Sequence, residues 1–249
     1  MSFPTYEGEF KRNAVEPIEC IKGGWNLIRS QYWLFLGITL VGVIIGSIVP
    51  FGILMGPMLC GIYLALFKTR RGEPIEFGLL FKGFDYFGDA VIATLIHIVP
   101  ILVIIVPAYV IFYIGFVLTM VASQRNGQPD PSALIGFLVL YGVFILAVIV
   151  IVTVLSVIFI FAYPLIVVRR LKGLDAVKMS IRAGLANFWR VLGLLLLLGL
   201  MTFAGLICCY VGAIFVMPIT YAALAVAYEQ VFGLREGQSS VPPPPPSFV

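Results

Sequence analysis

Charged residues are scarce in this chain: Asp, Glu, Lys and Arg together account for 11 % of its 249 residues. Soluble domains carry about 25 % charged residues, so the chain has too few polar side chains to cover a water-facing surface or to bind a nucleic acid. Hydrophobic residues account for 61 %, and the mean hydropathy is +1.08. This composition excludes a soluble globular domain and predicts an integral membrane protein.

The residue types that carry most enzyme and metal chemistry are also few. His97 is the only histidine, and the four cysteines have no CxxC spacing. The sequence contains no GxSxG, Walker or HExxH motif, and no pair of carboxylates lies inside an apolar run. We therefore expect a non-enzymatic protein with no catalytic residues, no cofactor and no metal, and we interpret the cysteines as small apolar residues.

Long apolar runs, separated by short polar segments, are what the sequence has in abundance. They predict an all-α fold, a polytopic membrane helix bundle with six transmembrane helices. The predicted spans cover residues 33–49, 51–67, 91–122, 134–168, 190–210 and 211–231. Together they form a transmembrane domain at 33–232, which follows a cytoplasmic arm at 1–32 and precedes a disordered, proline-rich cytoplasmic tail at 233–249.

The predicted spans differ in length. The first two have about 17 residues each, or roughly 25 Å, and only just cross a hydrocarbon core of about 30 Å, so a re-entrant first hairpin is an open alternative. The third and fourth runs are roughly 48 Å long and must tilt, kink or protrude. Pro100 and Pro107 lie inside the third run and favour a kink there.

The sixteen Lys and Arg residues fall almost entirely on one side of this six-span arrangement. Fifteen lie in the N-terminal arm, around the connections that follow the second and fourth spans, or in the tail, and only Arg125 lies on the opposite side. By the positive-inside rule, both termini are expected to face the cytoplasm. Anionic lipid headgroups are the expected partners of this basic face.

The chain also contains an internal repeat. Aligning Trp33 with Trp189 without gaps superimposes two copies of one plan, in which an amphipathic stretch precedes a span, a turn and a second span. Each second span carries a proline near its start, Pro57 or Pro218. A third copy is expected at 74–88, where four apolar residues recur at helical spacing: Phe77, Leu80, Phe81 and Phe84. The repeat predicts three hairpins, each preceded by a cytoplasmic in-plane amphipathic helix that anchors at the headgroups or docks a partner.

Three residues are candidates for helix packing or solute contact: His97, Pro57 and Pro218. An ionisable group inside a span is a functional-site hypothesis, and His97 is the only such imidazole. The two prolines could unwind their helices and expose backbone carbonyls to a solute, as discontinuous helices do in transporters. Helix packing is the alternative role for all three residues.

The C-terminal tail is a candidate for partner binding. Five consecutive prolines favour a polyproline II rod, which fits aromatic-lined grooves, and a free C-terminal residue can add to a sheet edge through its carboxylate. The residues concerned are Pro242, Pro243, Pro244, Pro245, Pro246 and Val249. A passive tail is the alternative.

A family resemblance covers nearly the whole chain except the tail. The run LDAVKMS at 174–180, followed by Asn187-Phe188-Trp189, Pro218 and Tyr228, resembles bacterial six-pass membrane proteins of unknown function, and the segment 33–61 fits the same pattern. This group is similar to the membrane domain that precedes the catalytic domain in some glycerophosphodiester phosphodiesterases, although no catalytic domain is expected here. The resemblance implies a location in the bacterial inner (plasma) membrane and supplies no functional residue.

Two functions fit these features. The first is a membrane scaffold or accessory subunit that contacts lipid headgroups or a protein partner through its cytoplasmic helices or tail. The alternative is a transporter or channel for an apolar or lipid-like solute, which would not need charges buried in the membrane. The GxxxG motif formed by Gly42 and Gly46 also makes a homo-oligomer an open alternative.

Overall fold

The computed structural model describes residues 10–49, 52–125, 131–207 and 211–233, with side chains left out at 122–125 and 131–134. All regular elements in these ranges are helical, which confirms the predicted all-α class. The elements are α1 (Pro17–Ile28), η1 (Arg29–Gln31), α2 (Tyr32–Ile48), α3 (Met55–Arg70), η3 (Phe77–Tyr86), α4 (Phe87–Arg125), α5 (Pro131–Phe159), α6 (Ala162–Arg169), α7 (Gly173–Ala186), α8 (Phe188–Ile207) and α9 (Val211–Phe232).

Several of these helices are long and apolar enough to cross a membrane. Within the described ranges, five helical segments meet that description: Pro17–Ile48, Phe77–Val121, Ile135–Arg169, Phe188–Ile207 and Val211–Phe232. Helix α3, which covers most of the predicted second span, has only 16 residues, or about 24 Å. The chain is thus a helical membrane protein. Both a membrane-spanning and a re-entrant first hairpin are consistent with the length of α3.

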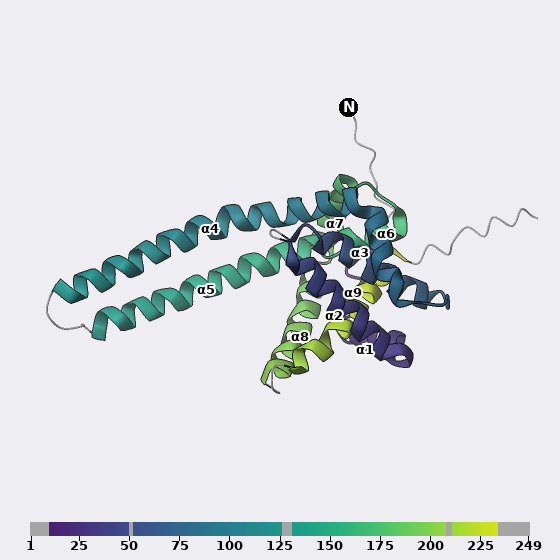
Figure 1. The fold of residues 1–249 in the computed structure, drawn as a ribbon, viewed down its shortest axis with the longest axis horizontal. Coiled ribbons are helices and arrows are strands. Elements are labelled where there is room, and N and C mark those ends of the chain that lie inside the picture. Colours follow the sequence, from purple (N-terminus) through teal and green to yellow (C-terminus); the bar gives the residue numbers. More distant parts are fainter. Residues whose placement is uncertain (1–9, 50–51, 126–130, 208–210, 234–249) are drawn as a thin grey trace, which may run out of the picture.

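Helices α4 and α5 form a long hairpin that extends away from the rest of the molecule (Figure 1). Helix α4 has 39 residues, or about 58 Å, and it continues through Pro100 and Pro107. The body from which this hairpin projects contains the other helices (Figure 1). The third run therefore forms one long helix that continues beyond the body, with both prolines inside it.

The fourth apolar run is interrupted where it enters the body. Helix α5 ends at Phe159 and α6 begins at Ala162, so the break leaves backbone groups without helical partners. The Ser180 hydroxyl of α7 donates to the Ile158 carbonyl over 2.8 Å and accepts from the Phe161 N–H over 3.1 Å. Pro164 lies in the first turn of α6, where a missing N–H costs no helical hydrogen bond. One buried serine thus satisfies both sides of the break.

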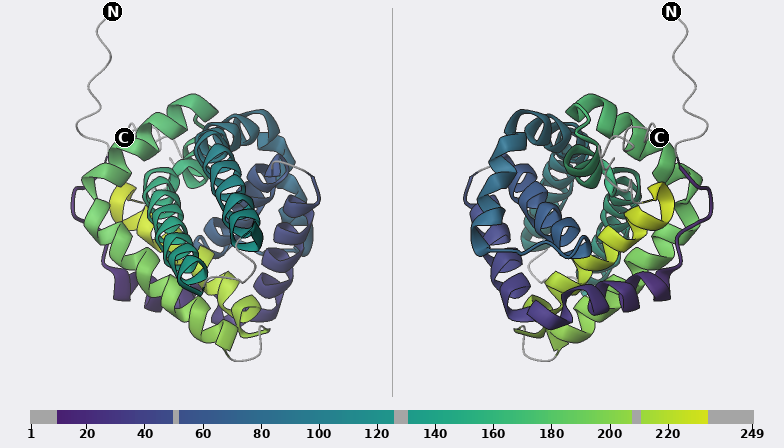
Figure 2. Two further views of the ribbon diagram at one scale, coloured as in Figure 1. Left: turned by 90° about the vertical axis from the view of Figure 1, so that its left-hand side faces the viewer. Right: turned by 90° about the vertical axis from the view of Figure 1, so that its right-hand side faces the viewer.

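Each short segment before a hairpin packs on the second helix of the preceding hairpin. Segment η3 packs on α3, α7 packs on α5 and α6, and α1 packs on α9 and so closes the arrangement into a ring. Figure 2, which views the molecule along its long axis, shows this ring, in which α2 and α3 of the first hairpin also contact α9 of the last. The three hairpins therefore follow one another around the ring in the same order as along the chain, and the last hairpin contacts the segment before the first.

Small residues allow close backbone approach at all three of these contacts. A Cβ added to Gly24 of α1 would lie 2.6 Å from the Ala223 nitrogen of α9, and one added to Gly184 of α7 would lie 2.5 Å from the Val157 carbonyl oxygen of α5. A Cβ on Gly61 of α3 would overlap the backbone of η3. Helices can approach this closely only where a side chain is absent, so these positions fix the ring.

Candidate functional site

The three sequence-predicted candidates lie in three different packing environments. The His97 ring of α4 stacks on Phe159 of α5, with ring centroids 4.6 Å apart and an interplanar angle of 9°. The Nε2 atom of His97 is buried and has no hydrogen-bond partner among the described residues. Pro57 is buried in the first turn of α3 against η3, and Pro218 is buried inside α9 about two turns from its start. The described contacts do not bring the three residues together.

Other predictions fall on residues that the structure does not describe. The tail candidates, Pro242, Pro243, Pro244, Pro245, Pro246 and Val249, lie outside the described ranges, as do Cys208 and Cys209. The other two cysteines, Cys20 and Cys60, are buried, as expected for small apolar residues.

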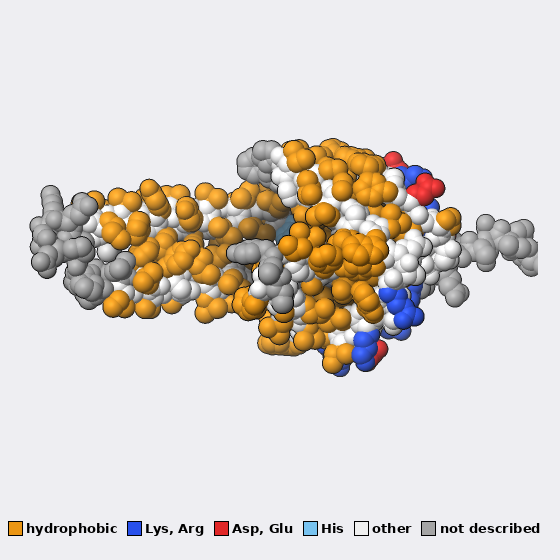
Figure 3. All heavy atoms as spheres, turned by 60° about the horizontal axis from the view of Figure 1, so that its bottom comes forward, with side chains coloured by type: hydrophobic (Ala, Val, Ile, Leu, Met, Phe, Trp, Pro, Cys, Tyr) orange, Lys and Arg blue, Asp and Glu red, His pale blue; other side chains and the backbone are white. Residues whose placement is uncertain are grey.

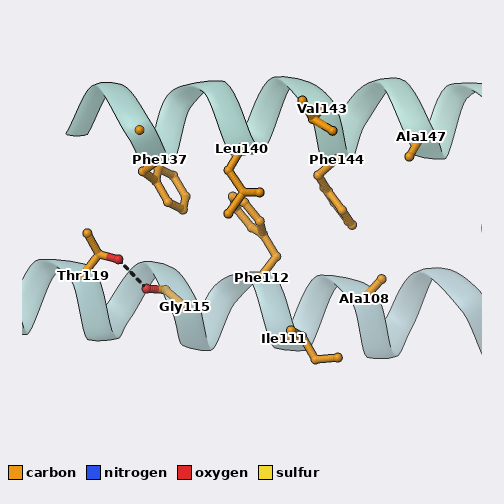
Figure 4. A pocket seen from close by; sticks show the side chains of 11 residues that line it. Ala108, Ile111, Phe112, Gly115, Thr119, Phe137, Leu140, Val143, Phe144 and Ala147 are labelled. Carbon is orange, nitrogen blue, oxygen red and sulfur yellow. Dashed lines mark hydrogen bonds between the residues drawn. The ribbon is translucent and has the colours of Figure 1, made fainter. Parts of the chain in front are cut away.

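An apolar cleft of about 720 Å³ separates α4 from α5. Figure 4 shows Phe112 reaching from α4 toward α5, with Phe137, Leu140 and Phe144 directed back from α5. The ring centroids of Phe112 and Phe137 are 4.7 Å apart, and those of Phe112 and Phe144 are 5.2 Å apart. These rings meet across the hairpin and hold the two helices apart, leaving the cleft beside them.

Glycines line this cleft without closing it. A Cβ added to Gly115 or Gly136 would meet nothing within 4 Å, whereas in the α8–α9 hairpin Gly205 and Gly212 press against each other's backbones. The Thr119 hydroxyl in the cleft donates to the Gly115 carbonyl over 2.8 Å (Figure 4). Its hydrogen is already used, so the cleft offers a ligand an almost entirely apolar wall.

A second feature, here called the α3–α9 seam, lies where these two helices meet near the charged end of the body. It consists of two aromatic pairs and one ion pair. The ring centroids of Tyr63 and Tyr221 are 6.3 Å apart, and those of Phe67 and Tyr228 are 5.4 Å apart.

The ion pair of the seam joins Arg70 of α3 to Glu229 of α9. The Arg70 Nε atom donates to the Glu229 Oε2 atom over 3.1 Å. The Glu229 side chain is only 8 % exposed, and its Oε1 atom is buried with no hydrogen-bond partner among the described residues. This pair links two hairpins, whereas each of the other ion pairs described lies within α1, between α3 and the turn that follows it, or within that turn.

Hydroxyl and thiol groups gather in the interior beside the seam. The Tyr163 and Thr94 hydroxyls are hydrogen-bonded at 3.1 Å. Tyr63 is 3 % exposed and Cys60 is fully buried. The Tyr63 ring contacts Tyr221, and α3, which carries Tyr63 and Cys60, packs on α6, which carries Tyr163. We call these five residues the hydroxyl cluster.

A segment near the N-terminus, residues 10–16, crosses the ends of α9 and α7 and is here called the strap. Asn187, which is fully buried, accepts from the Ala14 N–H over 2.9 Å and donates to the Lys11 carbonyl over 3.1 Å. The Gln230 side chain accepts from the Glu16 N–H over 2.8 Å. The amides of Asn187 and Gln230 thus hold the strap through its backbone.

Charged side chains gather at the end of the body opposite the tip of the α4–α5 hairpin, while the rest of the same face is largely hydrophobic (Figure 3). The exposed bases include Lys172, Lys178 and Arg182 of the α7 region. The tryptophans that align in the repeat, Trp33 and Trp189, are 74 % and 79 % exposed. The two repeat copies therefore place the same aromatic residue at the surface.

The seam and the strap were missed by the sequence analysis. Glu229 offered a signal, because it is the only charged residue in the apolar run 211–232. Asn187 offered a weaker one, since the repeat aligns this buried amide with Gln31. Neither signal identifies the partner residue, because Arg70 and the strap lie far away in the sequence.

Comparison with known proteins gives one match. A family model described as a domain of unknown function (DUF7847) matches residues 85–244, which is more than half of the chain. The matched region begins near the end of η3 and so leaves out the first hairpin. No curated protein and no solved structure matches the chain. On the strength of the family model, the chain belongs to the family described as a domain of unknown function (DUF7847).

Proposed function

We propose that the chain is a non-enzymatic membrane scaffold or accessory subunit, anchored by six spans with both termini in the cytoplasm. The observation that carries this proposal is the separation of surfaces, with charge at one end of the ring and apolar side chains along the long hairpin (Figure 3). A basic end beside the membrane attracts anionic headgroups or an acidic protein surface. The short segments α1, η3 and α7 act as the in-plane helices of this end, with Trp33 and Trp189 at the headgroup level.

The proposed setting is the bacterial inner membrane. It rests on the basic connections between spans and on the resemblance to six-pass bacterial proteins, which extends to the membrane domain of some glycerophosphodiester phosphodiesterases. In that setting the basic end meets a cytoplasmic leaflet that carries anionic lipids.

Native mass spectrometry of the protein in lipid discs tests this proposal. We expect anionic phospholipids, or a stoichiometric protein partner, to remain bound to the wild-type chain. A variant carrying Lys172→Glu, Lys178→Glu and Arg182→Glu should retain fewer anionic lipids, since each basic residue near the surface contributes about 1 kcal/mol to the attraction. A matched control changes Thr220, Thr202 and Ser156, away from the basic end, to alanine and should retain as many as wild type. Equal retention by the triple glutamate variant, with no protein partner bound, contradicts the proposal.

A second candidate function is binding or passage of an apolar or lipid-like solute, and the α4–α5 cleft favours it. The cleft has a volume of about 720 Å³, within the usual range of ligand sites, and its lining is almost entirely apolar. Its glycines leave space that any larger residue would fill.

Filling the cleft tests this second candidate. We expect the double variant Gly115→Leu and Gly136→Leu to fold, because both positions face open space, and to lose at least about 90 % of any apolar molecule that co-purifies with the wild type. The measurement is mass spectrometry of the organic extract from purified protein. Gly199→Leu is the matched control, since Gly199 of α8 also faces open space but does not line the cleft. Unchanged retention in the double variant rules out the cleft as the binding site.

A further inference from the structure

We propose that the α3–α9 seam is a cytoplasmic gate over the hydroxyl cluster and that the Arg70–Glu229 ion pair holds this gate closed. The inference rests on the second candidate function, because a gate controls access for a solute, and it places a path for that solute in the body, apart from the α4–α5 cleft. It assigns a role to the buried carboxylate of Glu229 and to the hydroxyl cluster, neither of which the scaffold function uses.

The seam forms successive layers from the charged end to the cluster, and its innermost ring pair, Tyr63 and Tyr221, belongs to both. Along α3, Cys60 lies deepest, and Tyr63, Phe67 and Arg70 follow toward the end of the helix. At a rise of 1.5 Å per residue, Cys60 lies about 15 Å from Arg70 along the helix axis. A water-soluble molecule that approaches along the seam therefore meets the ion pair first, then the Phe67–Tyr228 ring pair, and then the Tyr63–Tyr221 pair.

The seam differs from the neighbouring contacts in how it is built. The contacts of α3 with η3 and of α9 with α1 bring backbone against backbone at Gly61 and Gly24. The backbones of α3 and α9 approach each other over a smaller area, and the ion pair and ring contacts between these helices are made by long side chains. Side chains can change rotamer without moving the backbone, whereas separating close-packed backbones disrupts the fold. The seam is thus the contact that can open while the ring stays intact.

The burial and charge of Glu229 favour two states of the seam, one closed and one open. A carboxylate that is 8 % exposed is stabilised in the closed state by Arg70, yet its Oε1 atom has no partner among the described residues. Removing the Arg70 charge leaves the carboxylate buried and uncompensated, which is strongly destabilising. Opening the seam gives that carboxylate water, so loss of the ion pair shifts the population toward the open state.

The chemistry of the cluster indicates the class of solute. Tyr63, Tyr163 and Thr94 offer hydroxyl groups, which donate to and accept from uncharged polar groups. The carboxylate of Asp89, in the first turn of α4, already accepts from the Gly173 N–H over 2.8 Å. We therefore assign an uncharged molecule with an apolar body and one hydrogen-bonding end.

Labelling of Cys60 measures the gate directly. In a background with Cys20→Ser, Cys208→Ala and Cys209→Ala, Cys60 is the one remaining thiol. We expect Arg70→Glu to raise the rate of Cys60 labelling by a water-soluble maleimide about tenfold or more in lipid discs, because it places a like charge beside Glu229. The milder Arg70→Gln is expected to give a smaller increase and keeps the test valid if Arg70→Glu does not fold.

A charge-exchange variant and a matched control test whether the Arg70–Glu229 ion pair controls Cys60 labelling. Arg70→Glu combined with Glu229→Arg restores the ion pair and should return labelling to the background rate. Lys68→Glu breaks the partly exposed ion pair between Lys68 of the same helix and Glu73 of the following turn, and it should leave the rate unchanged. Arg70 variants that fold and label at the background rate, or an exchange variant that labels as fast as Arg70→Glu, overturn the proposal. Retention of apolar molecules is a separate measurement, so a working gate without a bound solute would refute only the second candidate function.

Discussion

Gly61→Ala is expected to prevent α3 and η3 from packing and to leave little folded protein. The added methyl group would overlap the Leu80 carbonyl, and Gly83 of η3 faces the Pro57 carbonyl of α3 in the same way. Extra methyl groups in a well-packed core cost about 1–3 kcal/mol when side chains can move aside, and here the obstacle is backbone. We expect a loss of about 3 kcal/mol or more, measured as a fall in monodisperse yield and in the melting temperature in detergent.

The same interface supplies the control. Gly78 of η3 has nothing within 4 Å of an added Cβ, so Gly78→Ala should fold with a yield close to that of the wild type. A Gly61→Ala protein with wild-type yield and melting temperature would falsify the claim that backbone contact fixes this interface. The comparison separates a local clash from a general intolerance of alanine in these helices.

The interface at Gly61 illustrates which part of the fold was predictable. Hydropathy located the apolar helices, because every predicted span overlaps a described helix. The alignment of Trp33 with Trp189 also placed a short helix, α1 or α7, before each of those hairpins. The positions of these helices depend on hydropathy within windows of about 15 to 20 residues, a length that the thickness of the bilayer sets directly.

The contacts between hairpins could not be predicted in this way. A glycine that allows close approach and a glycine that leaves space look identical in the sequence, as Gly61 and Gly115 show. The break at the end of α5 depends on Ser180, about twenty residues further along the chain. The pairing of Arg70 with Glu229 depends on ring closure between the first and last hairpins. Each of these features is set by residues distant in sequence, on which hydropathy gives no information.

The two candidate sites, the α4–α5 cleft and the α3–α9 seam, also differ in where they lie in the molecule. The cleft lies in the protruding hairpin, where side chains such as Val103 and Leu118 are 67 % and 64 % exposed and lipid is the expected neighbour. The seam lies in the body, where it joins helices of different hairpins. A change in the cleft is therefore not expected to alter Cys60 labelling, and a change in the seam is not expected to alter the cleft.

A second large effect is expected when the side chain that holds the strap, residues 10–16, is removed. Asn187→Ala removes the side chain that accepts from the Ala14 N–H and donates to the Lys11 carbonyl. Each buried polar group left without a partner costs about 1–3 kcal/mol, so the docked strap should lose roughly 2–4 kcal/mol relative to the released one. Because Lys11 and Arg12 are exposed, trypsin should cut the released strap at these two residues.

Limited proteolysis followed by intact-mass measurement tests this expectation. Cleavage after Lys11 or Arg12 should be about 30-fold or more faster in Asn187→Ala than in wild type, since cleavage of a transiently open segment follows its equilibrium population. Gln230→Ala should give a smaller increase, because it frees the Glu16 N–H at the far end of the strap. Asn26→Ala, at an exposed position of α1, should not change the rate. Equal rates in Asn187→Ala and Asn26→Ala would show that the buried amide does not hold the strap, and the N-terminal segment would then be held by the burial of Val15 and the ring contact of Phe10 with Phe232.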